Sequence, residues 1–340
     1  MTTLILAIAL FAIFLGAEAF TNALEHLGKR LKISEGVTGS VFAAIATALP
    51  ETMVPIVAIL GATAAQEVRE DVAIGAILGA PLMLSTIALF LMAVFAGRAR
   101  GWKDHLRPER TGLTRDLKWF LMVFSLATVA LFIPPSAALI RATLVLTLIM
   151  MYFIYLMLTI RASARLVQNG HATEADHPLY IVTYPRHIGL SGLPENMVTI
   201  VIQLAAGFGL IIIGAKGFVH GIETLSAAIG VSALVLSLLI IPVATELPEK
   251  VNSILWIRRR RDTLAFGNIT GAMVFQGSLL PALGIVLTPW EPCIEVVAAV
   301  ALTLLASAYL LVLKRRHALR PYHLVVNGLC YGAYCLVITL

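Results

Sequence analysis

One six-residue pattern occurs twice in this chain of 340 residues, each time within an apolar stretch that is long enough to cross a lipid bilayer. Residues 46–51 read A-T-A-L-P-E, and residues 244–249 read A-T-E-L-P-E. A carboxylate beside a helix-breaking proline is costly in hydrocarbon, and such residues mark ion paths and substrate sites in membrane proteins. Two copies at corresponding positions in the two halves of the chain therefore predict one site built from both.

The composition indicates a protein with many membrane-spanning segments. Hydrophobic residues make up 59% of the chain and charged residues 13%, whereas about a quarter of the residues in soluble domains are charged. Most of the apolar runs are close to the ~20 residues that a helix needs to span a bilayer. They lie at 3–23, 37–60, 72–96, 117–133, 136–160, 198–221, 231–257, 264–287, 293–313 and 321–340. We therefore expect an all-α membrane protein with ten transmembrane helices.

The basic residues alternate from one predicted loop to the next. The odd-numbered loops hold nearly all of them, including four consecutive arginines at 258–261, and the even-numbered loops have only Arg69 and Arg141 at or near helix ends. By the positive-inside rule the odd loops are cytoplasmic and both termini lie outside. The net charge of +6 thus indicates membrane topology and membrane lipids as surroundings, with no nucleic-acid partner. We expect a prokaryotic inner membrane.

The similarity between the two halves extends beyond the motif. A shift of 198 residues aligns residues 15–51 with residues 213–249, and 12 of these 37 positions are identical. Each half has five predicted crossings, and this odd number places the second half in the membrane upside down relative to the first. We predict a first inverted repeat over 1–165, a cytoplasmic connector over 166–197 and a second inverted repeat over 198–340.

Glycines recur in the helix that follows each motif. Gly75 and Gly79 align with Gly267 and Gly271 under a shift of 192 residues. Glycines four residues apart leave one face of a helix without side chains, so another backbone can approach closely. We expect these third and eighth helices to pack tightly against the two helices that carry the motifs.

The motif supplies oxygen atoms of several kinds. A proline cannot donate its backbone nitrogen, so Pro50 and Pro248 free the carbonyl groups four residues earlier. The predicted donors are the carbonyls of Ala46 and Ala244, the hydroxyls of Thr47 and Thr245, and the carboxylates of Glu51 and Glu249. Hard oxygen ligands with two negative charges suit a group 2 cation or sodium. Protons can neutralise the same carboxylates when no metal is bound, so proton coupling is also available.

These residues resemble the cation/calcium exchanger superfamily, whose two α-repeats read close to G-T-S-L-P-E on one helix and G-N-x-x-G-S-N or G-S-D on the next. The resemblance covers both repeats and the five-plus-five topology. It implies an antiporter that exchanges calcium or another divalent cation for sodium or protons, with its ion site on the second, third, seventh and eighth helices. Glu51 and Glu249 would be the principal ligands, and Thr47, Thr245 and the carbonyls of Ala46 and Ala244 would complete the shell.

The glycine motifs depart from the family pattern. Pro81 and Met273 stand where the family places Asn or Asp. Pro81 would free the carbonyl of Ile77 as a substitute ligand, while calcium does not favour the Met273 thioether. Asn268 keeps the amide of the family, and Gln276 is a further candidate ligand.

The second motif has two unusual charges. Glu246 replaces the family's serine, and Lys250 directly follows Glu249. In one interpretation Lys250 pairs with Glu246, four residues away on the same helix, and lowers the cost of burying a third acid. In the other, its ammonium stands where a transported sodium would bind, which leaves protons as the coupling ion.

The remaining features favour a structural role or chance. Glu18 and Lys216 occupy equivalent repeat positions and suggest an ion pair, and the third L-P-E at 193–195 lacks the A-T lead of the motif. The chain has no H-E-x-x-H pattern and no Asp-rich diphosphate motif. We therefore expect no enzyme activity, no cofactor beyond the transported cation, and inorganic cations as partners. The lost family ligands keep one alternative open, a non-transporting or metal-sensing membrane protein on the same scaffold.

Overall fold

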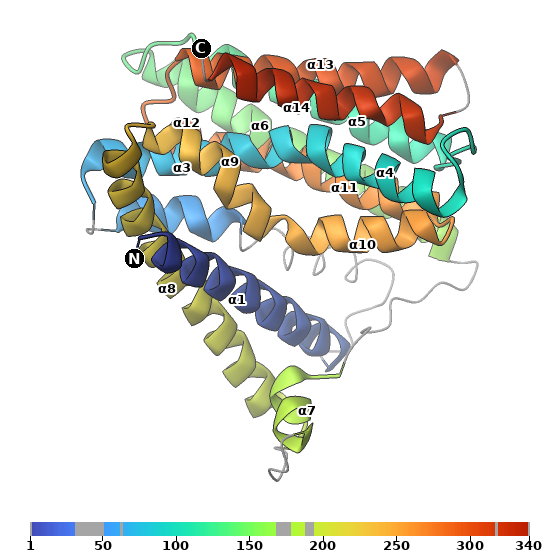
Figure 1. The fold of residues 1–340 in the computed structure, drawn as a ribbon, viewed down its shortest axis with the longest axis horizontal. Coiled ribbons are helices and arrows are strands. Elements are labelled where there is room, and N and C mark those ends of the chain that lie inside the picture. Colours follow the sequence, from blue (N-terminus) through green and yellow to red (C-terminus); the bar gives the residue numbers. More distant parts are fainter. Residues whose placement is uncertain are drawn as a thin grey trace. The chain divides into compact units, whose positions relative to one another are not determined.

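A computed structural model describes residues 2–30, 51–61, 64–167, 178–187, 194–316 and 319–338 (Figure 1). Contacts divide the chain into two compact units. The first contains Met1–Ala64 and Phe153–Leu225, and the second contains Ala65–Tyr152 and Ser226–Leu340. Each unit draws on both halves of the chain, so this division does not test the predicted repeat boundaries, which stay a prediction.

The described residues are helical apart from turns, loops and an isolated antiparallel bridge. In chain order the helices are α1 (Thr2–Arg30), Glu51–Leu60, α3 (Gln66–Met83), the π-helix η1 (Leu84–Ala88), α4 (Leu89–Arg100), α5 (Arg110–Ala130), α6 (Ala138–Val167), α7 (Tyr180–His187), α8 (Met197–Ile229), α9 (Ala233–Thr245), α10 (Leu247–Arg258), α11 (Asp262–Gln276), α12 (Leu279–Leu287), α13 (Ile294–Arg316), the 3-10 helix η2 (Pro321–Leu324) and α14 (Val325–Val337). The all-α class is confirmed.

Six of the described segments are long and apolar enough to cross a membrane. They are Thr3–Leu24, Gln66–Arg100, Ala138–Arg161, Met197–Ile229, Asp262–Leu287 and Ile294–Leu313. Glu51–Leu60 and Ala233–Val243 are shorter apolar helices. Helices cover most of the described part of each predicted apolar run, but the number of ten crossings stays a prediction.

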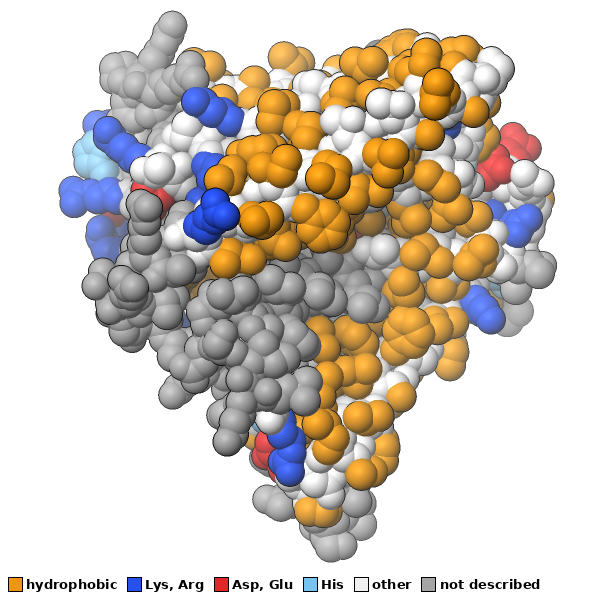
Figure 2. Space-filling model, turned by 180° about the vertical axis from the view of Figure 1, so that it is seen from behind, with side chains coloured by type: hydrophobic (Ala, Val, Ile, Leu, Met, Phe, Trp, Pro, Cys, Tyr) orange, Lys and Arg blue, Asp and Glu red, His pale blue; other side chains and the backbone are white. Residues whose placement is uncertain are grey.

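Large hydrophobic side chains are exposed on many of these helices. Leu139 on α6 is 82% exposed and Leu329 on α14 is 67% exposed. Figure 2 shows hydrophobic side chains spread over much of one face. A surface of this extent marks contact with lipid in a chain of this composition, so the chain is an integral membrane protein.

In the first unit, α1 and α8 cross with almost no space between their backbones. A Cβ atom added at Gly16 would lie 2.8 Å from the carbonyl oxygen of Gly207 and 2.9 Å from the Ile211 nitrogen. One added at Gly214 would lie 2.8 Å from the carbonyl oxygen of Ala9 and 2.9 Å from the nitrogen of Ile13. These two sets of contacts map onto each other under the 198-residue shift. The crossing is therefore isologous, as two copies related by a two-fold axis require.

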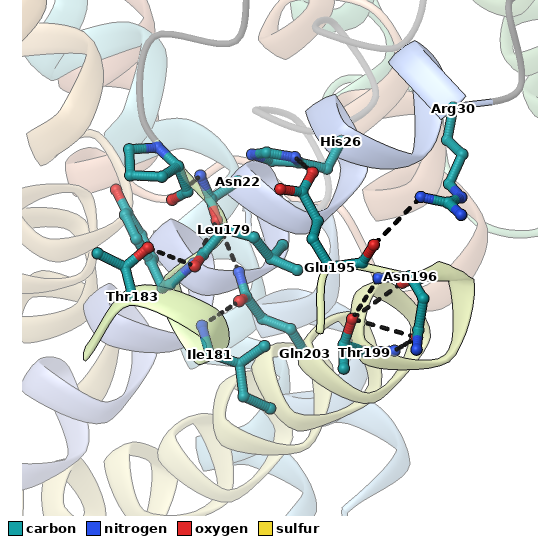
Figure 3. Close-up of polar contacts among 12 residues, drawn as sticks. Asn22, His26, Arg30, Leu179, Ile181, Thr183, Glu195, Asn196, Thr199 and Gln203 are labelled. Carbon is teal, nitrogen blue, oxygen red and sulfur yellow. Dashed lines mark hydrogen bonds and ion pairs between the residues drawn. The ribbon is translucent and has the colours of Figure 1, made fainter. Parts of the chain in front are cut away.

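A polar cluster attaches the short helix α7 to α1 and α8 (Figure 3). Asn22 of α1 and Gln203 of α8 are buried, and the Gln203 amide nitrogen donates to Asn22 Oδ1 at 2.8 Å. The backbone amides of Tyr180 and Ile181 donate to Asn22 Oδ1 at 3.1 Å and to Gln203 Oε1 at 2.8 Å. The first turn of a helix has amides without intrahelical acceptors, so these side chains fix where α7 begins.

In the second unit, α3 packs against α9 at the predicted glycines. A Cβ atom at Gly75 would lie 2.6 Å from the Cβ of Ser237, and one at Gly79 would lie 2.5 Å from the carbonyl oxygen of Leu238. The predicted close approach is confirmed at these two glycines. At Gly267, no described atom lies within 4 Å of such a carbon.

Three predicted cytoplasmic loops meet at one end of the second unit. Arg260 in the seventh loop forms an ion pair with Asp104 in the third at 3.0 Å. Leu106 of the third loop pairs with Leu319 of the ninth in the antiparallel bridge. The His105 amide, which donates to Asp104, and the nearby Arg260 guanidinium hold the pKa of the Asp104 carboxyl below its usual range. The grouping agrees with the expectation that odd loops share one side.

The even loops meet each other as well. Arg141, in the fourth predicted loop region, is buried and donates to the carbonyl oxygens of Ile285 and Pro289, each at 2.9 Å. Ile285 lies in the last turn of α12, where a cation is favourable because helix carbonyls point outward. Arg141 therefore joins the fourth and eighth loops. Which face is cytoplasmic stays a prediction.

The glycine approach predicts a contrast between two Gly→Ala variants. Gly79→Ala should lower the free energy of unfolding by about 1–3 kcal/mol, because the new methyl group has to push a backbone carbonyl aside. Gly267→Ala should be neutral or stabilising, because alanine lowers the conformational entropy of the unfolded chain and its methyl group meets no clash in the folded one. Thermal unfolding midpoints in detergent measure both effects, and equal midpoints would contradict the packing of α3 on α9.

Candidate cation site

The second motif forms a broken helix, as the sequence predicts. α9 ends at Thr245 and α10 begins at Leu247, and Glu246 lies between them with φ −94° and ψ 2°. Pro248 occupies the first turn of α10, where its missing N–H group costs least. Figure 1 shows the chain changing direction between α9 and α10. Backbone bonds from Glu246 to Pro242 and from Lys250 to Glu246 still cross the interruption, but Pro248 has no N–H group to donate to the carbonyl of Ala244.

Parts of the predicted ligand set lie on this break. Thr245 is buried, and its hydroxyl donates to the carbonyl oxygen of Ile241 at 3.3 Å. The backbone of Ala244 belongs to the last turn of α9 and that of Glu249 to the first turn of α10. The side chain of Glu249 lies outside what the structure describes.

The first motif is described only at its last residue. Ala46 and Thr47 lie outside the described residues, and Glu51 is the first described residue of the helix Glu51–Leu60 in the first unit. The Glu51 side chain is 6% exposed. Met53, two residues later, packs against a core cluster from α1 and α8. The expected meeting of Glu51 and Glu249 at one ion therefore stays a prediction.

Glu246 and Gln276 form a buried polar pair. Both side chains have an exposed fraction of 0%, and the Gln276 amide nitrogen donates to Glu246 Oε1 at 2.6 Å. Gln276 ends α11 three residues after the buried Met273, on the same helix face. The amide thus stands one turn beyond the position where the family has its Asn or Asp. The sequence marked both residues as candidates, and the structure brings them together.

Lys250 reaches back across the helix break. Its side chain is 5% exposed, and Nζ donates to the carbonyl oxygen of Pro242 at 2.7 Å and to Met83 Sδ at 2.8 Å. Eight residues of unbroken helix would separate Pro242 from Lys250 by about 12 Å along the axis. The contact therefore depends on the kink. The predicted pairing of Lys250 with Glu246 stays a prediction.

The other candidates lie on the helices next to the break. The Asn268 amide on α11 donates to the buried hydroxyl of Ser253 on α10 at 3.1 Å. Ile77 is fully buried on α3, which continues past Pro81 into the π-helix η1. Single-turn π segments occur often at functional sites. The bond between Asn268 and Ser253 thus joins α11 to α10 beside the break.

Asp116 is a buried acid that the sequence analysis did not name. Asp116 on α5 is buried, and Thr270 on α11 donates to its Oδ2 at 2.9 Å. Thr270 lies between Asn268 and Gln276 on the same helix. A carboxylate inside a membrane costs free energy, and this cost is the signal by which the sequence could have singled out Asp116. Its position next to the basic third loop made it look like a loop residue.

Among the described residues, no three His, Cys, Asp or Glu side chains are placed to hold a metal. The donors gathered at the break are instead carbonyl, amide, hydroxyl and carboxylate oxygens. A helix broken at membrane depth beside a buried acid is the arrangement by which many secondary transporters bind ions. The geometry therefore defines the class as a membrane transporter of ions.

The chain belongs to the sodium/calcium exchanger protein family, whose model matches residues 1–161 and 199–340. This result confirms the resemblance to the cation/calcium exchanger superfamily. The match leaves out residues 162–198, and the connector expected over 166–197 stays a prediction. The family is one of transporters and not of enzymes.

Two curated relatives are similar over most of their length. The putative antiporter CaxA of Alkalimonas amylolytica is 25% identical over 287 residues, which cover 84% of this chain and 81% of that protein. The inner membrane protein YrbG of Escherichia coli K12 is 25% identical over 293 residues, which cover 86% of this chain and 81% of that protein.

Solved structures share the fold. The H+/Ca2+ exchanger CAX superposes with a TM-score of 0.68 at 17% identity, covering 99% of this chain and 86% of that chain. The sodium-calcium exchanger NCX_Mj superposes with a TM-score of 0.59 at 17% identity, covering 99% of both chains. At this identity the likeness shows the fold alone.

The buried pair predicts a measurable coupling between Glu246 and Gln276. Gln276→Leu should cost about 1–3 kcal/mol of stability, because it removes a donor from a buried carboxylate. Adding Glu246→Met should cost less than the sum of the single changes, because the orphaned acid is gone. Gln66→Leu is the matched control, since Gln66 donates to Glu70 at 2.8 Å on an exposed helix surface. A loss at Gln276 no larger than that at Gln66 would contradict this role.

Proposed function

We propose that the chain is a secondary active antiporter that exchanges calcium or another divalent cation for sodium or protons. The observation that carries this proposal is the helix break at Glu246 with its buried acid and amide, in a chain of the exchanger family. Oxygen donors of mixed type suit a hard cation, and calcium accepts six to eight of them in irregular geometry. The curated relatives and solved structures bear names of antiporters and calcium exchangers, which supports the same class.

The ion site in this proposal is formed by both motifs. Glu51 and Glu249 are the principal ligands. Thr47, Thr245 and the carbonyls of Ala46 and Ala244 complete the shell, with Asn268, Gln276 and the carbonyl of Ile77 as further donors. The inverted arrangement brings the two motifs to one ion from opposite sides of the membrane. Glu51 and Thr245 are both buried, as ligands of an ion held inside the protein would be.

Exchange follows from the charge of the empty site. Leaving several carboxylates bare in an apolar environment is expensive, so the empty site does not reorient until a metal, sodium or protons neutralise it. We infer alternating access in which α1 and α8 move relative to the helices of the site. The close glycine crossing and the bond between Asn22 and Gln203 would let these two helices move together as one body. The membrane is a prokaryotic inner membrane, with the odd loops and their arginines on the cytoplasmic side.

Removing either motif carboxylate should abolish transport. Glu51→Gln and Glu249→Gln in proteoliposomes should each reduce counterflow of a divalent cation by about 100-fold or more, since each loses a charged ligand. Glu195→Gln is the matched control, because Glu195 ends the third L-P-E, which stands outside both motifs. Its flux should equal that of the unmodified protein. Undiminished flux in both motif variants would refute the proposed ligands.

Antiport predicts that divalent uptake depends on an opposing gradient. Proteoliposomes loaded with sodium, or with acidic buffer, should accumulate radioactive calcium against its gradient, and liposomes without either gradient should not. A protein that binds calcium at equilibrium but drives no counterflow would instead be a metal sensor on the same scaffold. The loss of polar ligands at Pro81 and Met273 is the feature that favours that second candidate.

A further inference from the structure

The Lys250 ammonium is itself a cation bound at the helix break. It is 5% exposed, and its partners include a backbone carbonyl oxygen and a thioether sulfur. The thioether is only a weak acceptor, so the Pro242 carbonyl is the stronger ligand of these two. Pro242 lies in the last turn of α9, where the helix dipole places partial negative charge.

This environment is one that a small monovalent cation would occupy. The Pro242 carbonyl oxygen accepts two bonds, one from the Glu246 amide at 3.2 Å and one from Lys250 Nζ at 2.7 Å. The buried Glu246 carboxylate adds negative charge within the same turn. A carbonyl oxygen and carboxylate charge at the negative end of a broken helix are the features that bind sodium in transporters with discontinuous helices.

We propose that the Lys250 side chain is a tethered cation that takes the place of a mobile monovalent cation, so that this chain exchanges a divalent ion without using sodium. The proposal rests on the proposed function and specifies its coupling. In this proposal the ammonium, which cannot leave the protein, fills the position throughout the transport cycle. Sodium therefore has no place to bind at this break.

The charges at the two motifs agree with this role. Glu51, Glu246 and Glu249 carry three negative charges, and Lys250 carries one positive charge. Two negative charges are left, which one divalent ion neutralises. Without Lys250 the same residues would need a divalent ion and a monovalent ion together.

The experiment empties the position and asks whether sodium fills it. Lys250→Ala removes the ammonium and leaves space, whereas Lys250→Met removes the charge but keeps most of the volume. Lys216→Ala is the matched control, since Lys216 is an exposed lysine on α8. Each protein is purified in detergent, and its thermal midpoint is measured in sodium chloride, methylammonium chloride or equimolar choline chloride. Calcium binding is titrated in the sodium and choline salts.

For the unmodified protein and Lys216→Ala, the calcium affinity and thermal midpoint should be the same in sodium as in choline. Lys250→Ala should gain thermal stability from sodium and from methylammonium, and its calcium affinity should change by about 5-fold or more between sodium and choline, the lower end of typical coupling between two sites. Lys250→Met should lose stability and stay insensitive to sodium, because the methionine side chain still fills the position.

Two outcomes would overturn the proposal. One is competition or stimulation by sodium in the unmodified protein, a measurement that decides the matter even if Lys250→Ala does not fold. The other is a folded Lys250→Ala variant that responds to neither sodium nor methylammonium. That result would mean that Lys250 only stabilises the broken helix. Failure of the proposed function is distinguishable, because it would appear as absent calcium counterflow in the unmodified protein while the thermal midpoints still report on sodium.

Discussion

The interruption between α9 and α10 is the constraint on which the rest of the second unit depends. A break inside an apolar segment leaves backbone groups without helical partners, and hydrocarbon offers them no water. Polar side chains from the neighbouring helices gather at this interruption. Lys250 donates to the carbonyl end of α9, and Gln276 of α11 donates to Glu246 at the break. The helices that surround the break are therefore also the ones that determine its charge.

Close backbone approach makes such an arrangement possible. Gly75 and Gly79 allow α3 to lie against α9, which brings Met83 at the end of α3 to the Lys250 ammonium. In the first unit, Gly16 and Gly214 serve the crossing of α1 and α8 in the same way, with contacts that repeat under the 198-residue shift. Small residues thus allow two close contacts, one around the site and one within the pair of helices that we expect to move.

The family match and the break lead to one functional conclusion from different directions. The match covers both motif regions and identifies an exchanger. The break shows that this chain keeps the interrupted helix while it replaces a serine by Glu246 and places Lys250 after Glu249. A lysine held by a backbone carbonyl is an unusual feature for a site that binds mobile cations. It is the reason to ask which ion drives the exchange rather than only which ion is carried.

The sequence by itself determined the helical class, the membrane location, the helix break and the glycine approach of α3, because these follow from hydrophobicity, proline and glycine in local windows. It also named Glu246, Lys250 and Gln276. Only the tertiary structure decided that Gln276 pairs with Glu246, 30 residues away, that Lys250 binds the Pro242 carbonyl, and that Asp116 accepts from Thr270 on another helix. Hydrophobic periodicity fixes which segments become helices, but partners on different helices depend on how those helices pack. The predicted meeting of Glu51 and Glu249 depends on packing in the same way, so local sequence patterns alone cannot decide it.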